Sequence, residues 1–176
     1  MAEKIDHEVV HHLMYRIMQT LSDIVDMSGG YVDKLEGDKI MALFGAKVAS
    51  ESDAVRAVDC ALRMLDAVEE VNSMLCSMEL ETGARAGISF GQVIVAPDAS
   101  GHLTATGDVV NVASRLESKA ETGTVMVSDS VRQECGELFQ WLDLGEITVK
   151  GRTSLIHAWR PQGAGAERIE RWERAW

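Results

Sequence analysis

The stretch that decides the fold covers residues 29–44 and reads GGYVDKLEGDKIMALF. The paired glycines end the helix predicted before them, because glycine readily takes the left-handed conformation that follows a last helical turn. Two runs with strand character follow at 31–36 and 39–44, and only Gly37 and Asp38 separate them. Such runs joined by two turn-forming residues predict a tight β-hairpin with an aspartate at its tip.

Long amphipathic helices are predicted on both sides of this hairpin. Upstream, apolar residues recur every three or four positions through residues 5–27, which is typical of one buried helix face. Downstream, Ser50 followed three residues later by Asp53 is a helix-capping pattern, and an apolar stripe then continues to Leu75. The hairpin therefore lies between two helices along the chain.

The rest of the chain alternates short strands with helices. A second hairpin is predicted around Gly91, from Arg85–Phe90 and Gln92–Val95, followed by a strand at 103–106 and a helix at 109–119. The remaining predicted elements are a strand at 124–127, a short helix from about Ser128, and strands near 139–144, 147–149 and 156–160. Because the strands come mainly as hairpins between helices, the predicted class is α+β rather than a doubly wound parallel sheet.

The composition is that of a single globular domain. The chain has 176 residues, of which 46% are hydrophobic and 26% are charged. Its formal net charge of −11 argues against binding to nucleic acid or to an anionic membrane surface, since both require concentrated positive charge. We expect residues 1–161 to form the domain and residues 162–176 to form a C-terminal tail.

We expect a cytoplasmic location. The first residues lack the apolar core of a secretion signal, and no apolar run is long enough to span a bilayer. The three cysteines are odd in number and have no metal-ligand spacing, which fits reduced thiols.

A second informative stretch covers residues 107–117 and reads GDVVNVASRLE. It places Asn111 and Arg115 four residues apart, so the two are neighbours on one helix face. The apolar residues between them predict a largely buried helix start. A buried amide and guanidinium need partners, and an anionic ligand is one candidate. A solvated surface pair is the alternative.

Taken together with a third motif, Val149-Lys150-Gly151-Arg152, these stretches resemble the class III adenylyl and guanylyl cyclases. That family is marked by a Gly-Gly, Lys, Gly-Asp hairpin, by Gly-Asp-x-Val-Asn-x-Ala-Ser-Arg at a helix start, and by Val-Lys-Gly-Lys/Arg near the end. The motifs occur here in the same order, and the combination is far more specific than any one of them. The resemblance covers roughly residues 8–160. It implies a ferredoxin-like, palm-type antiparallel sheet with helices on one face.

The resemblance implies a purine-reading role for two side chains. Lys34 occupies the position at which adenylyl cyclases carry a lysine that contacts the adenine ring, whereas guanine-directed members usually carry glutamate there. Thr104 matches the second base-reading position, and its hydroxyl can accept a hydrogen bond from the adenine amino group. Lysine with threonine therefore favours ATP over GTP.

The remaining roles concern the ribose, the phosphates and the metal ions. Asn111 resembles the asparagine that orients the ribose, and Arg115 the arginine that stabilises charge on phosphorus. Lys150 resembles the lysine that binds the terminal phosphates, although a plain surface turn is as good an interpretation of that residue. Asp38 resembles the second of two carboxylates that hold a pair of divalent cations, Mg2+ or Mn2+.

The resemblance also implies that the family's first strand is absent from this chain. That strand carries Phe-x-Asp-Ile-x-Gly-Phe-Thr and supplies the first metal carboxylate, and nothing before Gly29 matches it. One carboxylate holds two divalent cations poorly, so we expect weak or no activity from the chain alone. A missing central strand would also leave backbone groups unpaired. We expect repair by strand exchange in a dimer, or by a local rearrangement using residues 161–176.

Three interpretations remain open. In the first, the chain is part of a longer cyclase that makes cyclic AMP. In the second, it is a degenerate half that lends its residues to a cyclase-domain partner or a second copy. The third is a nucleotide-binding or interaction module without catalysis of its own, because a fold does not by itself imply a function.

Overall fold

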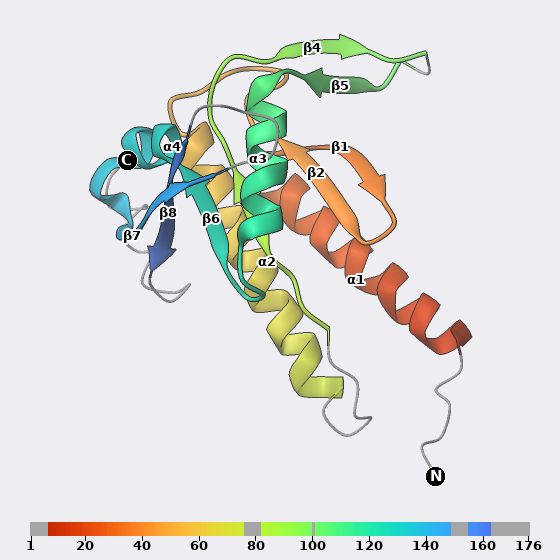
Figure 1. Ribbon diagram of the computed structural model, residues 1–176. Coiled ribbons are helices and arrows are strands. Elements are labelled where there is room, and N and C mark those ends of the chain that lie inside the picture. Colours follow the sequence, from red (N-terminus) through yellow and green to blue (C-terminus); the bar gives the residue numbers. More distant parts are fainter. Residues whose placement is uncertain (1–6, 76–81, 100, 149–154, 163–176) are drawn as a thin grey trace.

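The computed structural model describes residues 7–75, 82–99, 101–148 and 155–162 (Figure 1). Its helices are α1 (His7–Met27), α2 (Asp53–Leu75), α3 (Asp108–Lys119) and α4 (Asp129–Cys135), with a 3-10 turn, η2 (Gly136–Leu138). Its strands are β1 (Tyr31–Glu36), β2 (Lys39–Leu43), β3 (Ala86–Ile88), β4 (Ile94–Pro97), β5 (Leu103–Thr106), β6 (Val125–Ser128), β7 (Gln140–Ile147) and β8 (Ile156–Gln162). The α+β class is confirmed, and so is the hairpin between two long helices. The predicted tail beyond Gln162 lies outside the described residues.

The strands form three sheets, and their pairing corrects one prediction. The orders are β1-β2, β3-β6-β8-β7 and β4-β5. The hairpin predicted around Gly91 is wrong: β3 pairs in parallel with β6, and β4 pairs in antiparallel with β5. A parallel pair needs a crossover connection, and the segment from β4 to α3 provides it. Periodicity along the sequence predicts where strands occur, but contacts between distant residues determine which strands pair.

A second correction concerns the end of the chain. The two strands predicted near 139–144 and 147–149 are one strand, β7, with a register shift between Asp143 and Gly145. Gly145 has φ 73°, a conformation that glycine adopts without steric cost, so one extra residue is accommodated as a bulge. The turn-forming residues within β7 therefore indicate an irregularity in the strand and not its end.

Helices cover both faces of the four-stranded sheet, which refines the expectation of helices on one face. Side chains alternate along β6: Val125 and Val127 enter a core with α2 and α4. Met126 points to the other face, where Leu116 of α3 packs against it. The inner strand β6 is buried on both faces, and its first three residues are accordingly apolar.

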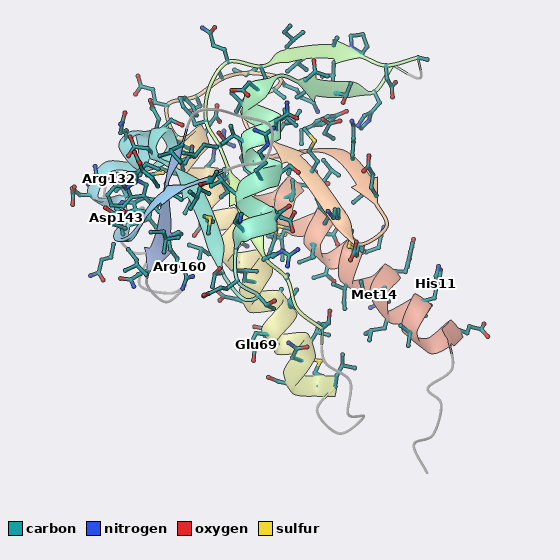
Figure 2. The ribbon with its side chains drawn as sticks, viewed as in Figure 1. His11, Met14, Glu69, Arg132, Asp143 and Arg160 are labelled. Carbon is teal, nitrogen blue, oxygen red and sulfur yellow. The ribbon has the colours of Figure 1, made fainter. Side chains whose placement is uncertain are left out.

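The other core joins the two long helices. Ile17 and Leu21 of α1 pack with Val68 of α2. Figure 2 shows His11 and Met14 on the N-terminal part of α1, which extends away from the body of the molecule. Within the described residues, no helix is long and apolar enough to cross a membrane.

Arg56 links the end of α1 to the start of α2. Its guanidinium donates to the carbonyl oxygens of Ser28 and Gly29, at 3.2 and 3.1 Å, and pairs with the carboxylate of Asp53. Asp53 in turn accepts a hydrogen bond from the backbone N–H of Ser50 at 2.7 Å, which confirms the predicted cap. The carbonyls that directly follow α1 are thereby satisfied by a cation.

Gly87 sets the distance between α3 and β3. A Cβ atom built on this residue would overlap the backbone of both Ala113 and Glu117. Backbone atoms cannot rotate away as a side chain can, so the helix could not stay in place above a larger residue.

Gly87→Ala is therefore expected to lower the free energy of unfolding by about 3 kcal/mol, because α3 must shift off the sheet. Gly83→Ala is the matched control: its Cβ would meet only the side chain of Thr122, so a loss of less than about 1 kcal/mol is expected. Urea unfolding of both variants measures the difference. Equal stability of the two would contradict this account of the α3 packing.

The core also holds a thiol. Cys135 is 2% exposed and packs with α2 and β6. Burial, together with a smaller effect from the nearby charge of Glu134, raises the pKa of this thiol from 9.0 to about 12. The folded protein therefore keeps the proton at pH values where the unfolded chain releases it.

Because the unfolded state then binds fewer protons, stability should fall as the pH rises from 9.0 towards about 12. The expected contribution approaches about 1.4 kcal/mol per pH unit. Chemical unfolding of the unaltered chain and of Cys135→Ala across this range isolates the effect. A variant that loses stability with pH as steeply as the unaltered chain would refute it.

Candidate active site

The β1–β2 hairpin carries an irregularity at Asp33. Glu36 faces Lys39 across the two-residue turn, but the register shifts between Val32 and Lys34. The bulge turns the carboxylate of Asp33 into the molecule, where its side chain is 0% exposed. Lys34 is exposed beside it.

The carboxylate of Asp33 connects β1 to β5. Its Oδ2 accepts a hydrogen bond from the backbone N–H of Ala105 at 2.9 Å and one from the hydroxyl of Thr104 at 3.2 Å. Lys34 and Thr104, the two predicted base-reading residues, are therefore carried by adjoining strands and joined through the residue next to Lys34. The two positions thus lie on strands that contact each other.

Tyr31 and His102 reinforce the same junction. Their rings stack with centroids 5.2 Å apart, and the Tyr31 hydroxyl lies 2.9 Å from Nδ1 of His102. The backbone N–H of Leu103 donates to that hydroxyl at 3.2 Å, and Nε2 of His102 lies within hydrogen-bond distance of the Asp33 carbonyl oxygen. The hairpin is held against β5 by both side-chain and backbone groups.

Helix α3 begins directly after β5. Gly107 precedes it with φ 142°, in the region that favours glycine. Val112 and Leu116 are buried, whereas Asn111 is exposed. The prediction of a largely buried helix start is thus wrong for Asn111, because only one stripe of α3 faces the sheet.

Arg115 lies one turn further along α3 and is half-buried. Its Nη1 is buried and has no hydrogen-bond partner among the described residues. In the described part of the chain, two other side-chain atoms are buried without a hydrogen-bond partner, Oδ1 of Asp33 and Nε of Arg132. Buried donors are almost always paired, so this unpaired guanidinium nitrogen of Arg115 is available to an acceptor such as a phosphate oxygen.

Asp38 lies exposed at the hairpin tip. The next residue, Lys39, lies 3.9 Å from the carboxylate of Glu117, near the C-terminal end of α3. In the described ranges, no group of three or more His, Cys, Asp or Glu side chains is arranged to hold a metal ion. The described residues of one copy therefore do not offer a donor set that fits a pair of divalent cations.

A pocket of about 290 Å3 lies beside the first turns of α3. Val109 and Val112 line it together with Ser89, Ser128 and Ile156, and none of the predicted site residues contributes to it. Lys150 lies outside the described residues.

With this geometry in hand, the chain can be compared with known proteins. The family described as the adenylate and guanylate cyclase catalytic domain matches residues 1–160. The chain belongs to this family. The cyclase domain is 31% identical over 162 residues to adenylate cyclase 1 of Rhizobium meliloti, covering 89% of this chain and 24% of that protein. The chain thus spans about a quarter of the length of that relative.

Solved cyclase structures share the fold of this cyclase domain. The guanylyl cyclase Cya2 superposes with a TM-score of 0.81 and 27% identity, covering 93% of this chain and 85% of that chain. The adenylyl cyclase CyaB from P. aeruginosa gives a TM-score of 0.78 at 24% identity, with coverage of 92% and 86%. The palm-type architecture is thereby confirmed.

Sequence reasoning missed three members of the junction in this cyclase domain. Asp33, Tyr31 and His102 contact one another or β5. Strict alternation along β1 assigns Asp33 to the face opposite Lys34, and a bulge leaves no strong sequence signal. The closeness of His102 to Tyr31 depends on tertiary structure, since 71 residues separate them.

An unpaired cation should contribute little to stability. We expect Arg115→Met to leave the free energy of unfolding within about 0.5 kcal/mol of the original or to raise it, because methionine removes an unsatisfied buried donor. Arg56→Met is the matched control: it removes a partnered guanidinium and should cost about 2 kcal/mol. Thermal unfolding without nucleotide distinguishes the two. A larger loss at Arg115 would show that its role is structural.

Proposed function

We propose that this cyclase domain converts ATP to cyclic AMP and pyrophosphate at a site shared by two subunits. The observation that carries the proposal is the buried, unpartnered Nη1 of Arg115, on the helix that begins with the family motif. A guanidinium nitrogen kept without a protein partner is suited to a ligand that brings negative charge. A nucleoside triphosphate is such a ligand.

The choice of ATP is supported by the junction of β1 and β5. Lys34 would donate to the adenine ring, and Thr104 would accept from its amino group. The relative in Rhizobium meliloti is named an adenylate cyclase, whereas Cya2 is named a guanylyl cyclase. The preference for ATP therefore rests on these two side chains.

The chemistry proposed for the phosphates is one displacement. The ribose 3′-hydroxyl gives up its proton to solvent and its oxygen attacks the α-phosphorus to form the new bond. The bond from that phosphorus to the bridging oxygen breaks, and pyrophosphate leaves. Asn111 would orient the ribose, and Arg115 would stabilise the charge that develops on the α-phosphoryl oxygens. Lys150 would bind the terminal phosphates.

Family members use Mg2+ or Mn2+, which when bound activate the hydroxyl and neutralise the leaving group. Asp38 is the proposed carboxylate of this chain for such an ion. We assign no second carboxylate for the ions among the described residues, so weak or no activity of the chain alone stays our prediction.

A shared site is supported by exposure. Lys34, Asp38 and Asn111 are all exposed in one copy. Apolar side chains are exposed on the same elements or nearby, with Leu35 52% exposed on β1 and Ile94 71% exposed on β4. Figure 1 shows β4 and β5 extended along one side of the molecule. In a head-to-tail pair, Asp38 of one copy would join Lys34, Thr104, Asn111 and Arg115 of the other.

Strand exchange is a further part of this proposal. β3 is the terminal strand of the four-stranded sheet, and β1-β2 forms a separate sheet. Terminal strands present backbone donors and acceptors to an incoming strand. A strand from a second copy or a cyclase-domain partner, inserted between the two sheets, would join them. The domain boundary at residue 161 and the cytoplasmic location likewise stay predictions.

A second candidate is a nucleotide-binding subunit without catalysis of its own. The observation that favours it is the arrangement at Asp38, where the described residues of one copy do not make a metal site. Such a subunit would bind ATP through the same residues and would depend on a partner for turnover.

ATP binding tests the proposal directly. We expect Lys34→Ala and Arg115→Ala each to weaken binding of a fluorescent ATP analogue, measured with Mn2+, by about tenfold or more, because each removes a charge-assisted hydrogen bond. Arg16→Ala, on the exposed face of α1, is the matched control and should bind as the unaltered chain does.

Two outcomes would count against these ideas. Unchanged binding in both Lys34→Ala and Arg115→Ala would leave only a scaffold with a cyclase fold. Appreciable cyclic AMP from the purified chain alone, lost in Asp38→Ala, would contradict the predicted inactivity and favour a complete site.

A further inference from the structure

We propose that Asp33 sets the base preference of this site by fixing the direction of the Thr104 hydroxyl. The inference rests on the proposed nucleotide site and adds a positioning residue to it. It concerns the polarity of one oxygen atom, which decides whether an amino group or a carbonyl group of a purine can face it.

The hydrogen of the Thr104 hydroxyl is committed to Asp33. Oδ2 of Asp33 lies 3.2 Å from the Thr104 oxygen and accepts the Ala105 N–H at 2.9 Å. A carboxylate only accepts hydrogen bonds, so the hydroxyl must be the donor in this pair. A hydroxyl has one hydrogen and two lone pairs, and with the hydrogen engaged, Thr104 offers only lone pairs to a ligand.

This polarity suits adenine and opposes guanine. Adenine carries an amino donor at position 6, where guanine carries a carbonyl acceptor. An acceptor-only oxygen can bond the amino group, whereas it would face the guanine carbonyl with two sets of lone pairs and no hydrogen between them. A polar pair left unsatisfied in this way costs about tenfold or more in affinity.

The position of Asp33 is itself closely held. Nε2 of His102 lies within hydrogen-bond distance of the Asp33 carbonyl oxygen and 4.0 Å from Oδ1. Tyr31 holds His102 by stacking and by its hydroxyl. With a fully buried side chain, Asp33 cannot easily exchange Thr104 for water.

One backbone irregularity thus orders both base contacts. The register shift between Val32 and Lys34 turns Asp33 inward, towards Thr104, and leaves Lys34 exposed on the same strand. In the proposed site, Lys34 would then supply a hydrogen-bond donor and Thr104 an acceptor. Adenine presents the complement, an acceptor ring nitrogen beside a donor amino group.

A purely structural role for Asp33 makes a different prediction. If Asp33 only anchors β5 through the Ala105 N–H, its removal disturbs the site and weakens all nucleotides alike. If it also fixes Thr104, its removal frees the hydroxyl to donate, and guanine nucleotides gain a bond that they lacked.

The experiment compares binding of fluorescent ATP and GTP analogues to the full chain with Mn2+ present. In Asp33→Ala we expect GTP affinity to rise about tenfold while ATP affinity changes by less than about threefold. In the double variant Asp33→Ala with Thr104→Val, the GTP gain should disappear, because the hydroxyl that would donate is absent. Circular dichroism establishes that each variant is folded.

Thr104→Val keeps the test decisive if Asp33→Ala does not fold. Removing the hydroxyl should weaken ATP binding about tenfold and leave GTP binding unchanged or tighter, because the oxygen supports only the amino group. A hydroxyl free to rotate could bond to either purine, and Thr104→Val would then weaken the binding of both ATP and GTP.

The outcomes separate the two proposals. A parallel loss of ATP and GTP affinity in Asp33→Ala, or an equal loss in Thr104→Val, would overturn the role of Asp33 while leaving nucleotide binding in place. Failure of the unaltered chain to bind either analogue would overturn the proposed function and this inference with it.

Discussion

The arrangement of the site depends on one buried carboxylate. Asp33 links β1 to β5 through the Ala105 N–H and the Thr104 hydroxyl, although β1-β2 and β4-β5 are separate sheets. A buried acceptor that lost these donors would carry the full cost of desolvation, so the link resists separation of the two strands. The positions of Lys34 and of the start of α3 follow from where these strands meet.

Polar groups in this cyclase domain divide into those that hold the fold and those available to a ligand. Arg56 and Asp53 have partners on both sides and join α1 to α2. Arg115 has a buried nitrogen without a partner among the described residues, and Asn111 is exposed. We expect groups of the second kind to contribute little to folding, which is the usual compromise at a functional site.

Much of the candidate site could be predicted from the sequence. Lys34, Thr104, Asn111 and Arg115 could be named because they occur within motifs of a known family. Their chemistry also follows from residue type. Asp33 could not be named, since its inward direction comes from a bulge whose energetic cause is the fit of β1 against β5.

The sequence by itself determined the helices, most strand positions, the two-residue hairpin turn and the α+β class. These features depend on local periodicity, on capping and on glycine, all of which act within a few residues. Only the tertiary structure decided that β3 pairs with β6, that α3 rests on Gly87, and that His102 meets Tyr31. Those contacts join residues far apart along the chain, and their energies come from packing and burial that exist only after the chain has folded.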